Sequence, residues 1–344
     1  MTSYISTQSL SSLLRQSTLR MQSELASGET ELATGNYADI GLELGGRTGE
    51  TVSLQAEASL LQTITSTNQT AALRLDTTQS VLSNAQAAAQ DLLDSLIHDN
   101  GSGSNASTIQ ASGKTNFEGL ISALNSSLNG DYIFAGTNTS NQPITDYYAA
   151  AAPNKAAVDS AFAVAFGMPQ SSPGVSAISG ASMQSFLDTQ FAPLFQGTSW
   201  TANWSSASSQ PLTNRISESQ TANTSVSANN TAFQQLAQAY AMIADLGTQT
   251  LNSSAYQAVT STARSLLTSA ISKLIDLQAS AGLVQSDVST ASSQISVQMN
   301  ILSTQIGKLE SVDPYEITTR VTDLKTQIET SYSLTSQPRA ELPY

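Results

Sequence analysis

The chain has 344 residues, of which 40% are hydrophobic and only 11% are charged, whereas soluble proteins carry roughly 25% charged residues. The formal net charge of −13, from 13 basic and 26 acidic residues, argues against nucleic-acid binding because phosphate contacts require clustered cations. No basic amphipathic stretch indicates an anionic membrane as a partner. The chain has no cysteine, which excludes disulfides, thiol catalysis and cysteine metal ligands.

The first 35 residues predict one amphipathic helix. Apolar or small residues recur at 3-4 spacing until Gly35, which we expect to end the helix; they are Leu14, Thr18, Met21, Leu25, Gly28 and Leu32.

The first twenty residues contain no apolar segment of signal-peptide length, and no apolar run in the chain is long enough to span a bilayer. We therefore expect a cytosolic protein or one exported without a cleaved signal.

A long heptad pattern follows and predicts a helix over about 51–98. Such a helix is roughly 70 Å long at 1.5 Å per residue, which is typical of a rod or bundle. We expect the glycine-rich residues 35–50 to form a flexible joint before it, and the run DNGSGSN at 99–105 to end it. The heptad positions are Leu61, Ile64, Asn68, Ala71, Leu75, Thr78, Leu82, Ala85, Ala89, Leu92 and Leu96.

Residues 106–129 predict a second amphipathic helix, which we expect Gly130 to cap. The segment after it, DYIFAGTNT, predicts a short strand and hairpin. In that strand Tyr132 and Phe134 alternate with Ile133, and Gly136 begins the turn.

Residues 141–214 differ in kind from the rest of the chain. They hold six of the nine prolines, both tryptophans and five phenylalanines. Because this proline spacing disfavours long helices, we predict a small, irregular, partly β domain inserted into a helical host.

Helical periodicity returns after residue 220. One helix is predicted near residues 233–243, and a longer one over about 253–311. Asp313 and Pro314 break the long helix, and a last amphipathic helix carries Ile317, Val321, Leu324 and Ile328 before Pro338 ends the regular structure.

The two chain ends thus each offer one amphipathic helix, and isolated helices of this length are marginal in water. They must pair with each other or with neighbouring subunits. We predict a mainly α fold, in which the N- and C-terminal segments form a long antiparallel helical bundle or coiled-coil rod with a small, partly β inserted domain.

Groups of residues that could carry chemistry are better explained as helix ends and turns. Asp91, Asp94 and His98 share a helical face, but a closed metal site needs a fourth ligand. The run at 99–105 loosely resembles a calcium loop, yet Gln110 stands where a bidentate glutamate is needed. The glycines of 41–49 lack the Lys-Ser/Thr ending of a phosphate-binding loop. We therefore predict no catalytic residue, no metal site and no cofactor.

Three segments carry a resemblance to a known family. They are LLRQSTLRMQSELASGETELATG at 13–35, NGDYIFAGTNTSNQPI at 129–144 and KLESVDPYEITTRVTDLKTQIETSYSLTS at 308–336. These resemble the opening helix, the hairpin and the closing helix of the flagellin superfamily, and the second segment resembles the hook-associated protein of the hook-filament junction more than a filament flagellin. Two segments depart from the family pattern: GNYADIGLELGGRTG replaces a polar turn, and the chain ends in TSQPRAELPY rather than in a short apolar helix.

The resemblance implies a division of the chain into three parts. Residues 1–45 and 312–344 are the terminal helices of an inner tube, 46–140 and 215–311 a helical rod domain, and 141–214 a surface domain. The implied assembly residues of the terminal helices are Leu14, Met21, Leu25, Leu32, Ile317, Val321, Leu324, Ile328 and Tyr332. The implied hairpin motif is Tyr132, Phe134 and Gly136.

The resemblance also implies a structural role outside the cell. A subunit at the hook-filament junction leaves through the flagellar type III export channel without cleavage, after contact with an export chaperone in the cytosol. It then contacts copies of itself in a ring, another hook-associated protein on the hook side and flagellin on the filament side, with no nucleic acid and no membrane as partner.

Three alternatives remain open at this point. The first is a filament-forming flagellin, and the second is a secreted adhesin or translocator with a coiled-coil stalk. The third is an enzyme lodged in 141–214, although that segment has no histidine and few acids, notably Asp159 and Asp188, to serve general acid-base catalysis.

Overall fold

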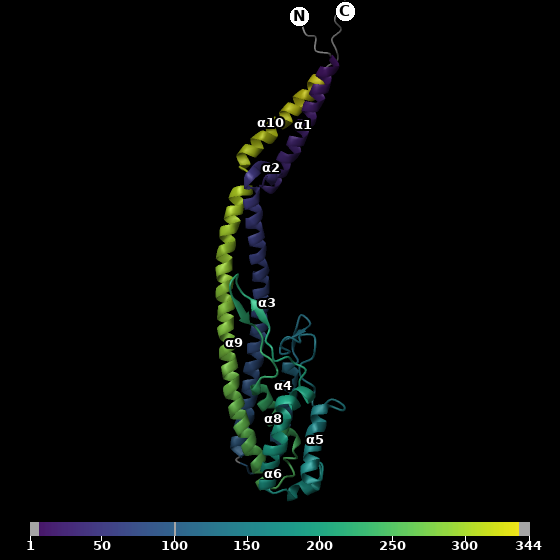
Figure 1. Ribbon diagram of the computed structural model, residues 1–344, viewed down its shortest axis with the longest axis vertical. Helices are drawn as coiled ribbons and strands as arrows, with labels where there is room; N and C mark the ends of the chain where they lie inside the picture. Colours follow the sequence, from purple (N-terminus) through teal and green to yellow (C-terminus); the bar gives the residue numbers. More distant parts are fainter. Residues whose placement is uncertain (1–6, 100, 337–344) are drawn as a thin grey trace, which may run out of the picture. The chain divides into compact units, whose positions relative to one another are not determined.

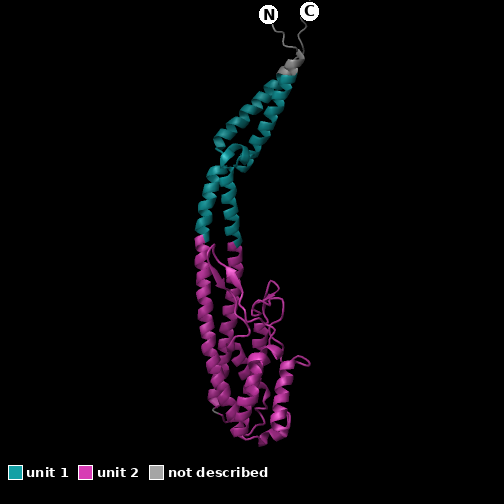
Figure 2. Cartoon of the chain, viewed as in Figure 1, with its two compact units in different colours: residues 1–63, 295–344 teal, residues 64–294 magenta. Residues whose placement is uncertain are grey.

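The computed structural model describes residues 7–99 and 101–336 and is mainly helical (Figure 1). It divides into two compact units (Figure 2): the first combines Met1–Thr63 with Ile295–Tyr344, and the second is Ile64–Gln294. Two long helices, α3 (Thr48–Asp99) and α9 (Ser253–Glu310), contribute residues to both units. The expected end of regular structure at Pro338 lies outside the described residues.

The first unit pairs the two terminal helices. Helix α1 (Thr7–Thr34) and helix α10 (Pro314–Ser336) lie side by side and antiparallel (Figure 1). Gly35 ends α1 as predicted, because its φ of 74° is left-handed and its N–H donates to the carbonyl of Glu31 at 2.8 Å. At the start of α10, a carboxylate oxygen of Asp313 accepts from the N–H of Tyr315 at 2.8 Å.

The joint between α1 and α3 is more ordered than the glycine content predicts. It contains the short helix α2 (Ile40–Leu44), capped by Asp39, and a 3-10 turn η1 (Gly45–Arg47). Its backbone also forms hydrogen bonds with the residues that join α9 to α10. The N–H of Tyr37 donates to the carbonyl of Glu310 at 2.9 Å, and the N–H of Val312 donates to the carbonyl of Gly35 at 3.0 Å. These bonds, rather than local propensity, hold the segment.

The heptad pattern of α3 is confirmed by burial. Every predicted position is buried or half-buried, including the polar ones. Asn68 sits in the stripe because its side-chain amide donates to the carbonyl of Ile216 at 2.9 Å and to the hydroxyl of Ser292 at 3.2 Å.

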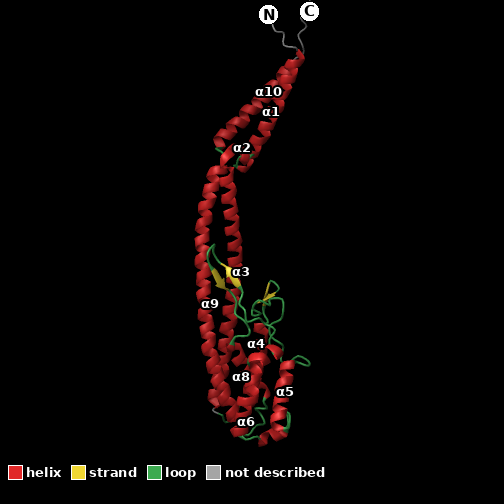
Figure 3. Ribbon diagram, in the orientation of Figure 1, coloured by secondary structure: helices red, strands yellow, loops and turns green. Residues whose placement is uncertain are grey.

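Shorter helices complete the second unit. They are α4 (Ala106–Leu124), α5 (Pro153–Phe166), α6 (Gly180–Phe186), α7 (Gly197–Asn203) and α8 (Thr231–Asp245), with single helical turns η2 (Pro173–Ala177), η3 (Leu187–Phe191) and η4 (Ala192–Phe195). Two small antiparallel sheets are formed by β1 (Ser127–Leu128) with β2 (Asp131–Tyr132), and by β3 (Thr213–Arg215) with β4 (Thr221–Asn223) (Figure 3). The mainly α fold with little β structure is therefore confirmed.

Helix α4 ends earlier than predicted. Its last residue is Leu124, and Gly130 is not its cap. Instead Asn129 and Gly130, with φ of 54° and 90°, form the tight turn of the β1–β2 hairpin, which suits the Asn-Gly preference of such turns.

Residues 141–214 form an aromatic core together with the surrounding helices. Trp204 stacks on Trp200 at 5.6 Å and on Tyr147 at 5.5 Å, and its ring also lies 6.1 Å from that of Phe117 in α4. Three of the six prolines stand in the first turn of a helical segment rather than break one, as Pro153 does in α5. In the structure this segment belongs to the second compact unit, and the proposed three-part division of the chain stays a prediction.

Candidate assembly surface

An apolar seam joins α1 to α10. On α10, Ile317, Val321, Leu324 and Ile328 are buried, and on α1 Met21 and Leu25 are half-buried. Between them lies Gly28, where an added Cβ would stand 2.9 Å from Cγ2 of Val321. The glycine thus lets the two helices approach closely.

Polar contacts flank this seam. Arg320 forms an ion pair with Glu31, whose other oxygen accepts from the N–H of Ala38 at 3.2 Å. Lys325 pairs with Glu29 at 3.1 Å, and the amide of Gln22 donates to the hydroxyl of Tyr332 at 2.6 Å. Lys325 and Glu29 are both exposed, and such a pair contributes only about 0–1 kcal/mol. Glu31, by contrast, is buried and has Arg320 and the N–H of Ala38 as its partners.

The seam includes only part of the predicted assembly set. Leu14, Leu32 and Tyr332 are 38%, 46% and 53% exposed. Leu32 lies outside the seam, where Glu31 is the buried residue at that level, and its place on the assembly surface stays a prediction. The buried residues hold α1 to α10, and Tyr332 also contacts α1 through the amide of Gln22. Leu14 and Leu32 are the exposed apolar members of the set.

Exposed apolar side chains concentrate in the first unit. Of the sixteen large hydrophobic residues that are exposed in the described part of the chain, eleven belong to it, although it holds only about a third of the residues. They are Leu13, Leu14, Leu19, Leu32, Leu42, Val52, Leu60, Val297, Ile301, Tyr315 and Tyr332.

The predicted hairpin motif lies in the second unit and is mostly interior. Phe134 is fully buried, with its ring 5.7 Å from that of Phe233, and Tyr132 is half-buried. The expected alternation is wrong, because the strand ends at Tyr132 and Ile133 is buried as well. Gly136 has a φ of 61°, and a Cβ there would lie 2.2 Å from the carbonyl oxygen of Ser208.

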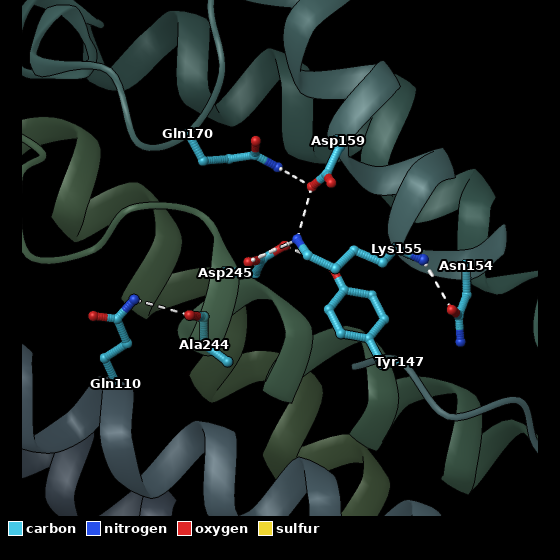
Figure 4. Close-up of polar contacts among 8 residues, drawn as sticks. All are labelled: Gln110, Tyr147, Asn154, Lys155, Asp159, Gln170, Ala244 and Asp245. Atoms are coloured by element: carbon cyan, nitrogen blue, oxygen red, sulfur yellow. Dashed lines mark hydrogen bonds and ion pairs between the residues drawn. The ribbon is translucent and has the colours of Figure 1, made fainter. Parts of the chain in front are cut away.

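A polar cluster that the sequence did not reveal attaches α5 to the end of α8 (Figure 4). The ammonium of Lys155 lies 3.0 Å from carboxylate oxygens of both Asp159 and Asp245. The hydroxyl of Tyr147 donates to Asp245 at 2.7 Å, and the amide of Gln170 donates to Asp159 at 3.0 Å. The Lys155–Asp159 spacing of four residues was visible in the sequence, but its partner Asp245 was not.

The protonation states in this cluster favour a structural role. Burial, together with the neighbouring Asp245, raises the pKa of Tyr147 far above its usual value. Burial lowers the pKa of Lys155, but its hydrogen bonds to Asp159 and Asp245 outweigh this effect and raise the pKa overall. A lysine that stays charged and a tyrosine that stays neutral are suited to hold α5 against the end of α8, not to act as a nucleophile or base.

The other chemical candidates behave as helix ends. Asp91, Asp94 and His98 are exposed, and Nδ1 of His98 lies 2.7 Å from the backbone carbonyl oxygen of Asp94. Among the described residues no group of three or more acidic, histidine or cysteine side chains is placed to hold a metal ion.

The run at 99–105 is a capped turn in the structure. The buried Asp99 accepts from the N–H groups of Gly103 at 3.1 Å and Asn105 at 3.2 Å, and from the hydroxyl of Ser102 at 3.2 Å. Burial raises the pKa of Asp99, but the hydrogen bonds that its carboxylate accepts outweigh this effect and hold the pKa below its usual value. These hydrogen-bond donors satisfy the carboxylate of Asp99, so the turn does not depend on a bound cation.

Comparison with protein-family models gives two matches. Residues 5–139 match the bacterial flagellin N-terminal helical region, and residues 264–341 match the bacterial flagellin C-terminal helical region. A comparison with curated proteins gave no match. In the described residues, no helix combines the length and apolarity needed to cross a bilayer.

The two family matches together cover more than half of the chain and include both helices of the α1–α10 seam as well as much of α3, α4 and α9. The flagellin family is structural and non-enzymatic, its members self-assemble into flagellar polymers, and its place is the extracellular flagellum. The chain belongs to the flagellin family and is a structural subunit of the bacterial flagellum.

Proposed function

We propose that this subunit joins a hook-associated protein to the flagellin filament at the hook-filament junction. The observation that carries the proposal is the segment 129–144, whose residues resemble the junction protein's hairpin more than that of a filament flagellin. Its place in the fold is consistent with a specialised structural element, because Phe134 and Gly136 are built into the core of the second unit.

The partners follow from this placement. The subunit contacts copies of itself in a ring, another hook-associated protein on one side and flagellin on the other, and it leaves the cell through the flagellar export channel with the help of a chaperone. The exposed apolar residues of the first unit support such contacts, because their burial on assembly stabilises the polymer by about 25 cal/mol per Å² of apolar surface. The implied assembly residues, Leu14 to Leu32 on α1 and Ile317 to Tyr332 on α10, remain proposals for this role.

Deleting the gene tests the proposal. Cells should carry bare hooks and release flagellin into the medium, because export continues while polymerisation has no base. Bare hooks without flagellin in the medium would instead identify the chain as the filament subunit, which is the second candidate. Normal filaments would contradict both.

A further inference from the structure

The chain contains two Asn-Gly pairs, and the structure places their glycines in different environments. Asn129 and Gly130 form the turn of the β1–β2 hairpin and are both exposed, and a Cβ added to Gly130 would meet no atom within 4 Å. In the other pair Gly101 is buried, and a Cβ there would stand 2.7 Å from Cγ of Gln257. Asn100, which precedes it, lies outside the described residues.

The side chain of Asn129 and the backbone nitrogen after it have no other partners. Within the described chain, neither the side-chain amide of Asn129 nor the N–H of Gly130 takes part in a hydrogen bond. The hairpin beside them is held, since the N–H of Tyr132 donates to the carbonyl of Thr139 at 2.8 Å. The turn therefore presents two groups that are adjacent, exposed and free to react with each other.

We infer that Asn129 is a site of spontaneous deamidation in the folded subunit. The backbone nitrogen of Gly130 attacks Cγ of Asn129, its proton passes through solvent to the side-chain nitrogen, and that nitrogen leaves as ammonia. The product is a five-membered succinimide ring. Water then adds to one of the two ring carbonyls and opens the ring to aspartate or to isoaspartate, so that one water is consumed and one ammonia released. Glycine permits the attack, because it has no Cβ to hinder the ring and its backbone rotates freely.

The fold should protect the second Asn-Gly pair from the same reaction. Ring closure requires the backbone around the asparagine to rotate, and a buried segment can rotate only after local opening, whose free energy adds to the barrier. Gly101 is buried beside Gln257, so the reaction of Asn100 has to wait for such an opening. The environment of the glycine, and not the dipeptide alone, thus distinguishes the two sites.

Isoaspartate changes the hairpin in two ways. It lengthens the backbone of the turn by one atom, whereas the pairing of Leu128 with Asp131 depends on a turn of two residues. It also adds a negative charge beside the exposed Asp131. The modified turn lies in the segment that supports the proposed junction role, but the chemistry is independent of that role.

Peptide mapping of the aged protein tests the inference. The full-length chain is incubated in mildly alkaline buffer, and trypsin then separates Asn100, in peptide 75–114, from Asn129, in peptide 115–155. Mass spectrometry should find the amide-to-acid mass increase at Asn129 accumulating about tenfold faster than at Asn100, because only the latter needs local opening. In urea, where both pairs are unfolded, the two rates should become similar.

Two results would overturn the inference. One is an Asn129 that stays intact in the folded chain while it deamidates in urea, and the other is equal rates at Asn129 and Asn100 in the folded chain. Gly130→Ala, measured in urea where strain in the turn plays no part, should slow the reaction about tenfold. Gly46→Ala is the matched control, because Gly46 is also exposed with open space around it but follows a glycine. An unchanged rate for Gly130→Ala would refute the succinimide route.

Hydrogen exchange separates the longer backbone from the added charge. The isoaspartate fraction, isolated by chromatography, should lose protection at the N–H of Tyr132, which is bonded to Thr139 in the intact hairpin. Asn129→Asp adds the same charge but keeps a normal two-residue Asp-Gly turn, and so it should retain that protection. Equal protection in the two proteins would contradict the expected opening of the hairpin.

Discussion

The turn between α3 and α4 depends on one buried carboxylate, and its removal gives a measurable loss of stability. Asp99 is 3% exposed and accepts two backbone N–H bonds and two hydroxyl bonds, from Ser102 and Ser104. Hydrogen bonds to a charged group contribute roughly 1.5–3 kcal/mol each. The loop amides can regain water in the variant, and so we expect Asp99→Ala to cost about 2 kcal/mol in total and Asp99→Asn, which keeps one acceptor, about 1 kcal/mol.

Tryptophan fluorescence during urea unfolding measures this loss in the right part of the molecule. Both tryptophans of the chain, Trp200 and Trp204, are buried in the second unit, to which Asp99 also belongs. Asp94→Asn is the matched control, since Asp94 is exposed on the last turns of the same helix. An Asp99→Ala midpoint equal to that of the control would refute the reasoning.

The effect should also depend on pH. The pKa of Asp99 is lower in the folded protein than the ordinary value, so its stabilisation is fully present above the unfolded-state value of about 3.9 and is lost as the pH falls through the lowered folded-state value. The difference between the natural chain and Asp99→Asn should therefore be constant from about pH 7 to pH 5 and shrink in more acidic solution. A difference that stays the same at the acid end would show that the charge of Asp99 is not what stabilises the turn.

Three further substitutions have clear expected outcomes. Gly136→Ala should destabilise the second unit by about 3 kcal/mol in thermal melts, because the new Cβ meets a carbonyl oxygen and φ is positive. Its control is Gly167→Ala, where φ is also positive but a Cβ meets open space, and this variant should cost only about 1 kcal/mol. Lys155→Met should cost about 1–2 kcal/mol in urea unfolding, since Asp159 and Asp245 lose their shared partner, whereas Lys114→Met breaks an exposed pair at 3.8 Å and should cost at most about 0.5 kcal/mol. Gly28→Leu should separate α1 from α10 at a cost of about 1–3 kcal/mol, visible as lost helicity by circular dichroism without any change in tryptophan fluorescence.

Periodicity in the sequence was sufficient to predict the long helices. In α3 and α9 one stripe of side chains is buried along the whole helix, so the 3-4 spacing of apolar residues carries the information. The boundary errors have local causes. The end of α4 was misplaced because the Asn-Gly pair at 129–130 was interpreted as a helix cap rather than as a hairpin turn.

Residues 141–214 were hard to predict because their order comes from long-range contacts. Their aromatic side chains show no single period, and Trp204 packs on Phe117, 87 positions earlier in the chain. In the same way, Lys155 meets Asp245 across 90 residues. Neither contact has a signature in a single sequence, since the spacing of the partners is set by the path of the chain and not by helix geometry.

The assembly surface was predictable only in outline, for a related physical reason. The sequence showed that each terminal helix needs a partner, because an amphipathic face of this length is marginal alone. The structure shows that α1 and α10 satisfy part of this need with each other, through residues such as Val321 against Gly28. Yet Leu19 and Tyr315 on their outer faces remain exposed. By contrast, the second unit buries its aromatic residues in one continuous core. Because most exposed large hydrophobic residues of the described chain lie in the first unit, that unit is the part suited to contacts with other copies.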